Sequence, residues 1–314
     1  MEAPSSTTHR VNLDAATLRS WPLPMPCGDG DKEVRGHVLI LGGSREMPGA
    51  VILAATAALR AGAGKLTIAT GASVAQLVAM AMPESRVLGL RENAQGGFAD
   101  DAIDVLDPVA DRIDAMLVGP GMQDEAATAR LVGRLLERLA CTGSGEEDEA
   151  RASIVLDANA MGIVREPDFQ FARPVILTPH AGEMAHLTGL DKDAIAAAPE
   201  QHAVEAAARW QAVLALKGAR TFIAGPGGER WQHEGGNVGL ASSGSGDVLA
   251  GIIAGLCARG ATLPQAACWG VALHAAAGEV LAARMGLLGY LARELPGEIP
   301  ALLERFSRPG EAPV

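Results

Sequence analysis

The sequence predicts an α/β protein in which a mostly parallel central sheet carries helices on both faces. Short apolar runs with strong β propensity recur along the chain, and several of them end in glycine. Stretches of about 10–15 residues with apolar side chains at helical spacing separate most of these runs, which is typical of parallel sheets. Nearly half of the 314 residues are apolar (48%) and only 20% are charged, so the chain can bury a large core and a disordered protein is excluded.

The regular pattern begins at His37, after a polar segment (residues 1–35) that contains several prolines. We expect this segment to form an arm over the body and residues 36–310 to form one domain, because no linker interrupts the pattern. The pattern opens with a strand over 37–41 and a helix over 49–61. Further strands are expected over residues 65–70, 86–90, 115–119, 153–158, 174–179 and 212–218.

The last third of the chain follows a different pattern. Residues 221–225 and the following ERWQHEGG are typical of a β-hairpin that finishes one edge of the sheet. From Val248 to about Leu295 the sequence is mostly helical, and Val248–Cys257 is apolar on all sides, which predicts a buried helix. The small, acidic tract 141–150 is predicted to be a solvated surface loop.

Composition and charge exclude several classes of protein. Acidic residues outnumber basic ones by 37 to 26, the net charge is −11, the pI is near 5.1, and aromatic residues make up 3%. Such a chain lacks the basic surface and the stacking side chains of a nucleic-acid binder. The four cysteines form no CxxC pair, which argues against a zinc ribbon or a disulfide scaffold and suits a reducing compartment. The N-terminus has no apolar signal core and no run reaches the ~18 apolar residues of a membrane span, so we expect a cytoplasmic protein.

Three loops follow strand ends, where open α/β sheets collect ligands. The most specific is ASSGSGDVLAG (241–251), in which Gly244 and Gly246 flank Ser245, and Asp247 follows where a helix begins. Glycines let a ligand approach the backbone, and the N–H groups of a helix start favour an anion. Asp247 alone would equally be a helix cap worth ~0.5–2 kcal/mol. The apolar helix behind it favours a functional role, because its N-terminus should then lie deep in a cleft.

The other two loops are less specific. LTPHAGEM (177–184) places His180 and Glu183 three residues apart at the start of another helix, where a capping box and a ligand site are equally good interpretations. LILGGSREMPGA (39–50) has glycines at a strand end, but it spells neither a Walker A motif nor GxGxxG.

Three shorter segments add weaker signals. LVGPGMQ (117–123) ends a strand in glycines. LKGART (216–221) places Lys217 where it could meet a nucleotide phosphate or simply be solvated. LDANAM (156–161) places Asp157 and Asn159 where they could contact a metal or substrate, with capping of the following helix slightly favoured.

Taken together and in this order, the segments GGSREMPGA, TPHAGEM, LKGART and SGSGDVLAG resemble the NAD(P)H-hydrate dehydratase family, a branch of the ribokinase-like superfamily. The resemblance runs from about His37 to the final helices. It implies a ribokinase-like three-layer sandwich and the dehydration of NADHX and NADPHX, cofactors hydrated at the nicotinamide ring, with ADP or ATP as co-substrate. It also implies Mg²⁺, a homotetramer, and a functional link to an epimerase that is encoded separately, because the chain resembles the stand-alone form.

The resemblance also assigns residues. The family's hydrate-binding residues fall on Ala50, Gly121, His180 and Asp247. Its nucleotide-binding residues fall on Lys217, Gly218, Ala219, Arg220, Thr221 and Gly246, with the backbone of Gly244 and Ser245 beside them. Family members usually have threonine where Ser245 stands, glycine or alanine where Ser243 stands, and aspartate where Asn159 stands; the last difference removes a carboxylate from any metal site there.

The implied mechanism gives each group a task. Asp247 would accept the proton of the ring hydroxyl as its oxygen attacks the terminal phosphoryl group, after which phosphate leaves more readily than hydroxide would. An ordinary carboxylate, pKa ~4, suffices if proton transfer is late. The N–H groups of Gly244, Ser245 and Gly246 would hold the developing charge, Mg²⁺ would bridge the phosphates, and Glu183 would contact the metal through water.

Two other functions compete with this one. A kinase of the same fold, acting on a hydroxymethylpyrimidine, thiazole or pyridoxal-like alcohol, would share the Gly-x-Gly-Asp motif and stop after phosphoryl transfer. The His180-Ala-Gly-Glu183 segment, in place of the Asn-x-x-Glu of the kinase branches, favours the dehydratase. A non-catalytic nucleotide-binding regulator would have no need of both Asp247 and Lys217.

Overall fold

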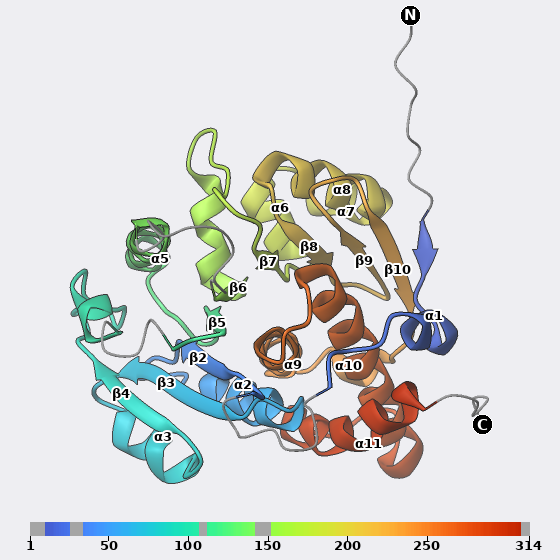
Figure 1. Ribbon diagram of the computed structural model, residues 1–314. Helices are drawn as coiled ribbons and strands as arrows, with labels where there is room; N and C mark the ends of the chain where they lie inside the picture. Colours follow the sequence, from blue (N-terminus) through green and yellow to red (C-terminus); the bar gives the residue numbers. More distant parts are fainter. Residues whose placement is uncertain (1–9, 26–33, 107–111, 142–151, 309–314) are drawn as a thin grey trace, which may run out of the picture.

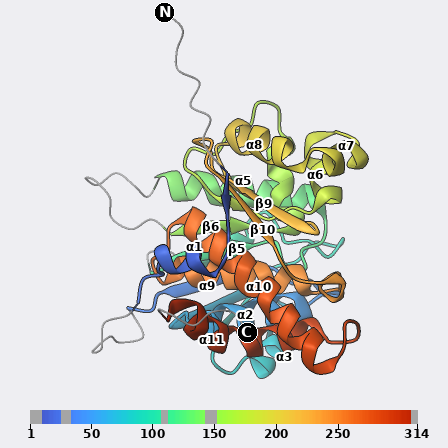
Figure 2. The same ribbon diagram turned by 90° about the vertical axis from the view of Figure 1, so that its right-hand side faces the viewer.

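A computed structural model describes residues 10–25, 34–106, 112–141 and 152–308. Its centre is a ten-stranded sheet with the strand order β1-β10-β9-β8-β7-β6-β5-β2-β3-β4. Helices cover both faces, so the predicted three layers are confirmed (Figures 1 and 2). Cys27 and nearly all of the acidic tract 141–150, predicted to be a surface loop, lie outside the described residues.

The body of the sheet is parallel, as predicted, and only its hairpin runs the other way. The parallel strands are β2 (His37–Leu41), β3 (Lys65–Gly71), β4 (Arg86–Leu90), β5 (Ala115–Val118), β6 (Ser153–Leu156), β7 (Ile176–Leu177) and β8 (Val213–Leu216). The expected hairpin is formed by β9 (Arg220–Ala224) and β10 (Arg230–Glu234), and β9 is also antiparallel to β8. Strands β6, β7 and β8 end earlier than predicted, because Asp157, Thr178 and Lys217 belong to loops that leave the sheet.

Two hydrophobic cores lie on opposite faces of the sheet. Val38 and Ile40 belong to one core and Leu39 and Leu41 to the other, as the alternation of side chains along a strand requires. The first face is covered by α2 (Gly49–Arg60), α3 (Ala75–Ala81), α9 (Ser245–Ala258), α10 (Leu263–Met285), η4 (Ala292–Glu294) and α11 (Leu295–Ser307). The second is covered by η1 (Ala102–Leu106), α5 (Glu125–Cys141), η2 (Ala158–Arg165), α6 (Ala181–Thr188), α7 (Lys192–Ala197) and α8 (Pro199–Trp210).

Helix α9 is buried on every side from Val248 to Ala258, as its apolar sequence predicts. It packs closely on α2 because two glycines face that helix. A β-carbon on Gly251 would lie 2.2 Å from the carbonyl oxygen of Ala54, and one on Gly255 would lie 2.5 Å from that of Ala58. Gly251 and Gly255 therefore allow the close packing of α9 on α2, and this packing fixes where the N-terminus of α9 points.

Helix α10 has the length and apolar composition of a membrane-spanning helix. Within the molecule, 67% of its most apolar window is buried, and α10 lies against α9 and α11. Since the core helix of a soluble protein has the same composition, α10 is explained by the packing seen here. Figure 2 shows it in the helical layer between the sheet and α11.

Residues 10–25 lie against the body of the molecule. Strand β1 (Val11–Asn12) pairs in parallel with β10, and Asp14 caps α1 (Ala15–Ser20) by accepting a hydrogen bond from the Thr17 N–H at 2.7 Å. The carbonyl oxygen of Trp21 accepts a hydrogen bond from Trp269 Nε1 at 2.9 Å. This segment thus adds a strand to the sheet edge. The sequence did not predict this strand, because the segment is polar and only two of its residues pair with β10.

Candidate active site

The first part of the site lies where the sheet reverses its direction of winding. The chain passes from β2 through α2 to β3 on one side and from β5 through α5 to β6 on the other. The loops after β2 and β5 therefore diverge and leave a crevice at the carboxyl ends of the strands, where such sheets bind ligands. The two loops are tied together, because the N–H of Gly43 donates to the carbonyl oxygen of Pro120 at 2.6 Å.

Ala50 and Gly121 meet in this crevice. Gly121 has a φ of +64°, and a β-carbon there would lie 2.6 Å from the carbonyl oxygen of Met47 and 2.8 Å from Cβ of Ala50. The structure thus brings together the two residues that the sequence assigned to one ligand from loops about 70 positions apart. Glycine is required at 121 by both the backbone angle and the close approach of α2.

Replacing Gly121 by alanine should lower the free energy of unfolding by more than the backbone strain alone. Gly189 supplies the matched control, because its φ is +74° and a β-carbon there would meet nothing within 4 Å. Gly189→Ala should cost about 1–2 kcal/mol from the left-handed backbone, whereas Gly121→Ala should cost roughly 1–3 kcal/mol more from the clash. Denaturant titration of both variants measures the difference; equal losses would contradict a tight contact between the loops.

The second part of the site is the N-terminus of α9. The helix begins at Ser245, and its N-cap is Gly244, which has a φ of +87° and makes no side-chain cap bond. Asp247 lies in the first turn, so the capping interpretation of this residue is wrong. The N–H of Ser245 donates to the carbonyl oxygen of Ser242 at 3.2 Å and is thus engaged within the turn, unlike the free donor that the sequence-based mechanism used.

Asp247 is a perturbed carboxylate. Burial, together with the charges of Asp157 and Glu183, raises its pKa to about 7, and the charge of Lys217 acts in the opposite direction. The sequence predicted an ordinary carboxylate. The difference arises from burial first, and then from charges that come from other strand ends. A carboxylate that titrates near neutral pH is suited to act as a general base.

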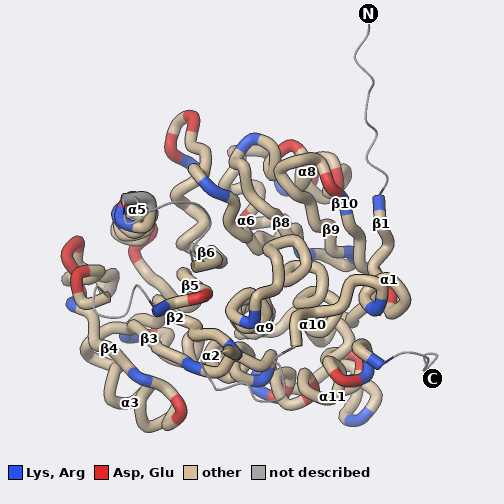
Figure 3. The backbone as a smooth tube through the Cα atoms, in the orientation of Figure 1, with Lys and Arg blue, Asp and Glu red and all other residues tan. Residues whose placement is uncertain are grey.

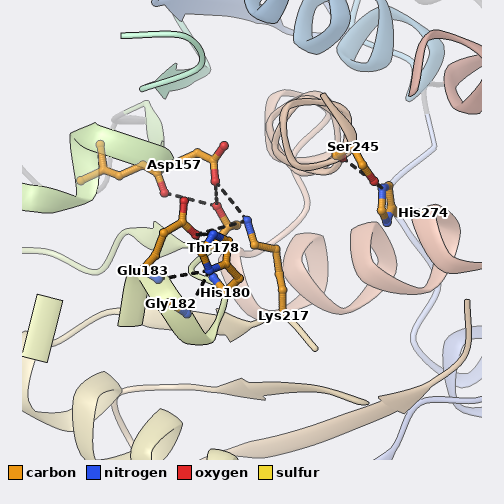
Figure 4. Close-up of polar contacts among 9 residues, drawn as sticks. Asp157, Thr178, His180, Gly182, Glu183, Lys217, Ser245 and His274 are labelled. Carbon is orange, nitrogen blue, oxygen red and sulfur yellow. Dashed lines mark hydrogen bonds and ion pairs between the residues drawn. The ribbon is translucent and has the colours of Figure 1, made fainter. Parts of the chain in front are cut away.

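Lys217 lies beside two of these carboxylates, Asp157 and Glu183 (Figure 4). Its Nζ is 3.5 Å from Asp157 Oδ1 and 3.7 Å from Glu183 Oε2. Asp157 is buried and accepts a hydrogen bond from Thr178 Oγ1 at 2.6 Å. Asp157 makes no side-chain cap bond to η2, so the slightly favoured capping interpretation is wrong for it, while Asn159 Nδ2 donates to the carbonyl oxygen of Met122 at 2.8 Å.

His180 has a capping function and also faces the site. Its Nδ1 accepts from the N–H groups of Gly182 and Glu183 at 3.0 and 3.1 Å, and Glu183 Oε2 accepts from the His180 N–H at 2.8 Å. The predicted capping box is confirmed. The ring is 58% exposed and lines a cavity, and its Nε2 lies 3.6 Å from Glu183 Oε2, so its outer edge is accessible to a ligand beside that carboxylate.

A cavity of about 750 Å³ opens beside Lys217 and the start of α9. Seven of the residues assigned from the sequence line it: His180, Lys217, Gly218, Ala219, Thr221, Ser245 and Gly246. Arg220 does not, because alternation along β9 turns its side chain outward to Glu234, 3.2 Å away. Gly244 lies behind the wall, where a β-carbon would meet Leu53 of α2 at 2.5 Å.

The rest of the cavity wall was not found from the sequence. It consists of His233, the loop 235–242 with η3 (Val238–Leu240), and one face of α10 that includes His274. The one available signal was a histidine in the alanine-rich stretch VALHAAAGEV. Burial lowers the pKa of His274 to about 4, so the ring is neutral near pH 7. The wall combines small and aliphatic residues with a few polar groups, as in sites for small organic ligands.

The carboxylates near the N-terminus of α9, Asp157, Glu183 and Asp247, fit a magnesium ion that is bound together with a phosphorylated ligand. Across the part of the chain that the structure describes, no three His, Cys, Asp or Glu side chains form a ready-made metal cage. Mg²⁺ rarely uses such a cage, since one or two carboxylates, phosphate oxygens and waters complete its shell. Asp157 and Glu183 raise the pKa of Asp247, which shows an excess of negative charge that a cation would relieve.

Comparison with known proteins adds a family match and close relatives. A family model described as NAD(P)H-hydrate dehydratase matches residues 38–301. The ADP-dependent (S)-NAD(P)H-hydrate dehydratase of Xanthomonas campestris is 51% identical over 94% of this chain and 97% of its own length. The bifunctional NAD(P)H-hydrate repair enzyme of Moorella thermoacetica is 39% identical over 95% of this chain, which spans 54% of that longer protein.

Solved structures give the same result for the fold. The ADP/ATP-dependent NAD(P)H-hydrate dehydratase of Bacillus subtilis, co-crystallised with ATP and Mg²⁺, has a TM-score of 0.77 and 29% identity, covering 96% of this chain and all of that one (100%). A ribokinase-like superfamily protein of Enterococcus faecalis has a TM-score of 0.78 and 26% identity, with 96% and 97% covered. The ribokinase-like fold predicted from the sequence is therefore confirmed.

Proposed function

The chain belongs to the NAD(P)H-hydrate dehydratase family, and on this basis we propose that it dehydrates the S-epimers of NADHX and NADPHX to NADH and NADPH with ADP or ATP as co-substrate. The chain is thus a hydro-lyase of cofactor repair. The observation that supports the chemistry best is a half-buried Asp247 with a pKa of about 7 in the first turn of α9, next to Gly246 in the cavity wall.

We assign Asp247 as the general base. It accepts the proton of the ring hydroxyl as the hydroxyl oxygen attacks the terminal phosphorus of the nucleotide, and the bond from that phosphorus to its bridging oxygen breaks, releasing AMP from ADP or ADP from ATP. The phosphorylated ring then eliminates inorganic phosphate: the bond from the ring carbon to the phosphate oxygen breaks, the neighbouring ring carbon loses a proton to water, and the double bond of the dihydronicotinamide is restored. Ala50, Gly121 and the outer edge of His180 would hold the hydrate.

The nucleotide would occupy the cavity with its phosphates toward Lys217. A β-carbon on Gly246 would lie 3.5 Å from Lys217 Nζ, so the ammonium group and the first turn of α9 face the same point. Gly218, Ala219 and Thr221 continue this wall. When bound, Mg²⁺ would neutralise charge on the phosphates, and Glu183 would be one of the residues that hold it.

A small-molecule kinase of the same fold is the weaker alternative. A hydroxyethylthiazole kinase from Pyrococcus horikoshii has a TM-score of 0.55 and 16% identity, a likeness that concerns the fold alone. Incubation with NADHX, ADP and Mg²⁺ separates the functions. A dehydratase restores the absorbance of reduced nicotinamide, a kinase leaves a phosphorylated alcohol, and a regulator without activity does neither.

The net charge of −11 predicts an unusual salt dependence, because both ligands are polyanions. Repulsion at long range should slow their approach, while backbone donors and Lys217 attract them only at short range. Raising the ionic strength from low values should therefore increase the association rate of ADP or leave it unchanged. Stopped-flow mixing over a salt series measures the rate; a marked fall would indicate a basic approach path instead.

The partners and location follow by analogy with the family. We propose a separately encoded epimerase that supplies the S-epimer, a cytoplasmic location and a homotetramer. The stand-alone relative from Xanthomonas, which matches over 97% of its own length, supports the first of these. Light scattering of the purified protein would test the tetramer.

A further inference from the structure

His274 is a largely buried polar side chain on the otherwise apolar helix α10, and it faces the first residue of α9. Its Nε2 lies 3.0 Å from Ser245 Oγ and 3.1 Å from the carbonyl oxygen of Ser245. Figure 4 shows the pair on the α9 side of the site, apart from Asp157 and Lys217. Both His274 and Ser245 line the cavity, so the pair belongs to the wall that a nucleotide would touch.

The two distances determine which ring nitrogen of His274 carries the proton. A carbonyl oxygen can only accept, so a bare Nε2 at 3.1 Å from it would oppose two lone pairs. Nε2 therefore carries the hydrogen, and it donates toward the carbonyl and the hydroxyl oxygen of Ser245 together. The ring is neutral near pH 7, so Nδ1 has no proton.

This arrangement gives the Ser245 hydroxyl a direction. Because Oγ accepts from His274, its own O–H must donate elsewhere. Ser245 is followed directly by Gly246, where a β-carbon would lie 3.5 Å from Lys217 Nζ, so the hydroxyl stands beside an ammonium group and a helix N-terminus. All three features attract an anion.

We propose that His274 is a positioning residue for the nucleotide: its Nε2–H holds Ser245 so that the serine hydroxyl donates to a phosphate oxygen in the cavity. This inference rests on the proposed function in one respect, that the anion is a phosphate of ADP or ATP. The sequence pointed to the backbone of Ser245, whereas the geometry assigns the task to its side chain and to a residue 29 positions away.

The test measures binding of Mg²⁺–ADP by calorimetry without any hydrate, so that it does not depend on turnover. Ser245→Ala and His274→Leu should each weaken binding roughly tenfold to hundredfold, the usual value of a hydrogen bond to a charged group. The double variant should bind no more weakly than Ser245→Ala, because His274 acts through that hydroxyl. Ser245→Thr and His274→Gln, which keep the hydroxyl and a donor of similar reach, should bind ADP nearly as the wild type does.

Three results would each contradict the proposal. It is overturned if Ser245→Ala binds ADP normally, if the two single losses multiply in the double variant, or if His274→Gln binds as weakly as His274→Leu. Thermal unfolding of each variant shows whether the fold is kept, and if His274→Leu does not fold, the comparison of Ser245→Ala with Ser245→Thr still decides. Failure of the wild type itself to bind ADP would instead count against the proposed function.

Discussion

Asp247→Asn should lose most turnover and keep nucleotide binding. The amide is close in size to the carboxylate but cannot accept the hydroxyl proton, and a positioned general base contributes about 10²–10⁴-fold in rate. Steady-state kinetics with NADHX and ADP measure the loss, and calorimetry measures the dissociation constant of ADP. Glu137→Gln, an exposed change on α5, is the control for loss of one negative charge. A near-normal rate in Asp247→Asn would contradict the assignment of Asp247 as the general base.

The pH dependence gives a second measurement of the same assignment. Below a pH of about 7 Asp247 is mostly protonated and cannot accept a proton, so kcat/KM for the hydrate should rise with pH through that value. This rise is the acid limb of the kcat/KM profile, and it reports the ionisation of a group in the free enzyme. The residual activity of Asp247→Asn should lack it, whereas Glu137→Gln should keep it unchanged.

Stability provides the check that Asp247→Asn is folded. The folded pKa of about 7 lies above the ordinary value of 3.8, so the folded state binds the proton more tightly and stability falls as pH rises between these values. Asparagine does not ionise, so the variant does not lose stability in this way as the pH rises. The variant should therefore unfold at a higher temperature than the wild type at pH 8 and at nearly the same temperature at pH 4. An equal difference in unfolding temperature at both pH values would show that the ionisation of Asp247 does not cause the difference in stability.

The sheet and its helices could be predicted because their signal is local. Each parallel strand in the middle of the sheet is buried on both faces, so runs such as HVLIL and SIVL are largely apolar. Helix α9 is apolar because it is buried on every side from Val248 onward. Strand β1 could not be predicted, because only two residues pair and what places them is the edge of β10. The strand ends were also predicted too long, since the sequence does not mark where Asp157 and Thr178 leave the sheet.

The site was predictable where a loop carries its own signature and unpredictable where distant residues meet. The glycines around Ser245 and the His180–Glu183 spacing are visible in short segments. The hydrogen bond from Thr178 to Asp157, and the pair of His274 with Ser245, join residues 21 and 29 positions apart and have no local signal. The raised pKa of Asp247 belongs to this second kind, because its causes are burial and charges from other loops.

Lys217→Met should weaken ADP binding and shift the pH profile at the same time. The ammonium group faces the first turn of α9, so its loss should raise the dissociation constant of ADP at least roughly tenfold, as expected for a hydrogen bond to a charged group. Its charge also lowers the pKa of Asp247, so the acid limb of kcat/KM should move to higher pH in the variant. Lys192→Met, an exposed change on α7, is the control for loss of one positive charge.

The direction of the shift distinguishes a local charge effect from general damage to the site. Lys217→Arg keeps the charge and should leave the limb near its wild-type position, whereas Asp157→Asn removes a charge that raises the pKa of Asp247 and should move the limb to lower pH. Opposite shifts from two residues that lie 3.5 Å apart cannot come from a common loss of structure. If Lys217→Met and Asp157→Asn move the limb in the same direction, the charges around Asp247 do not control its pKa as the structure indicates.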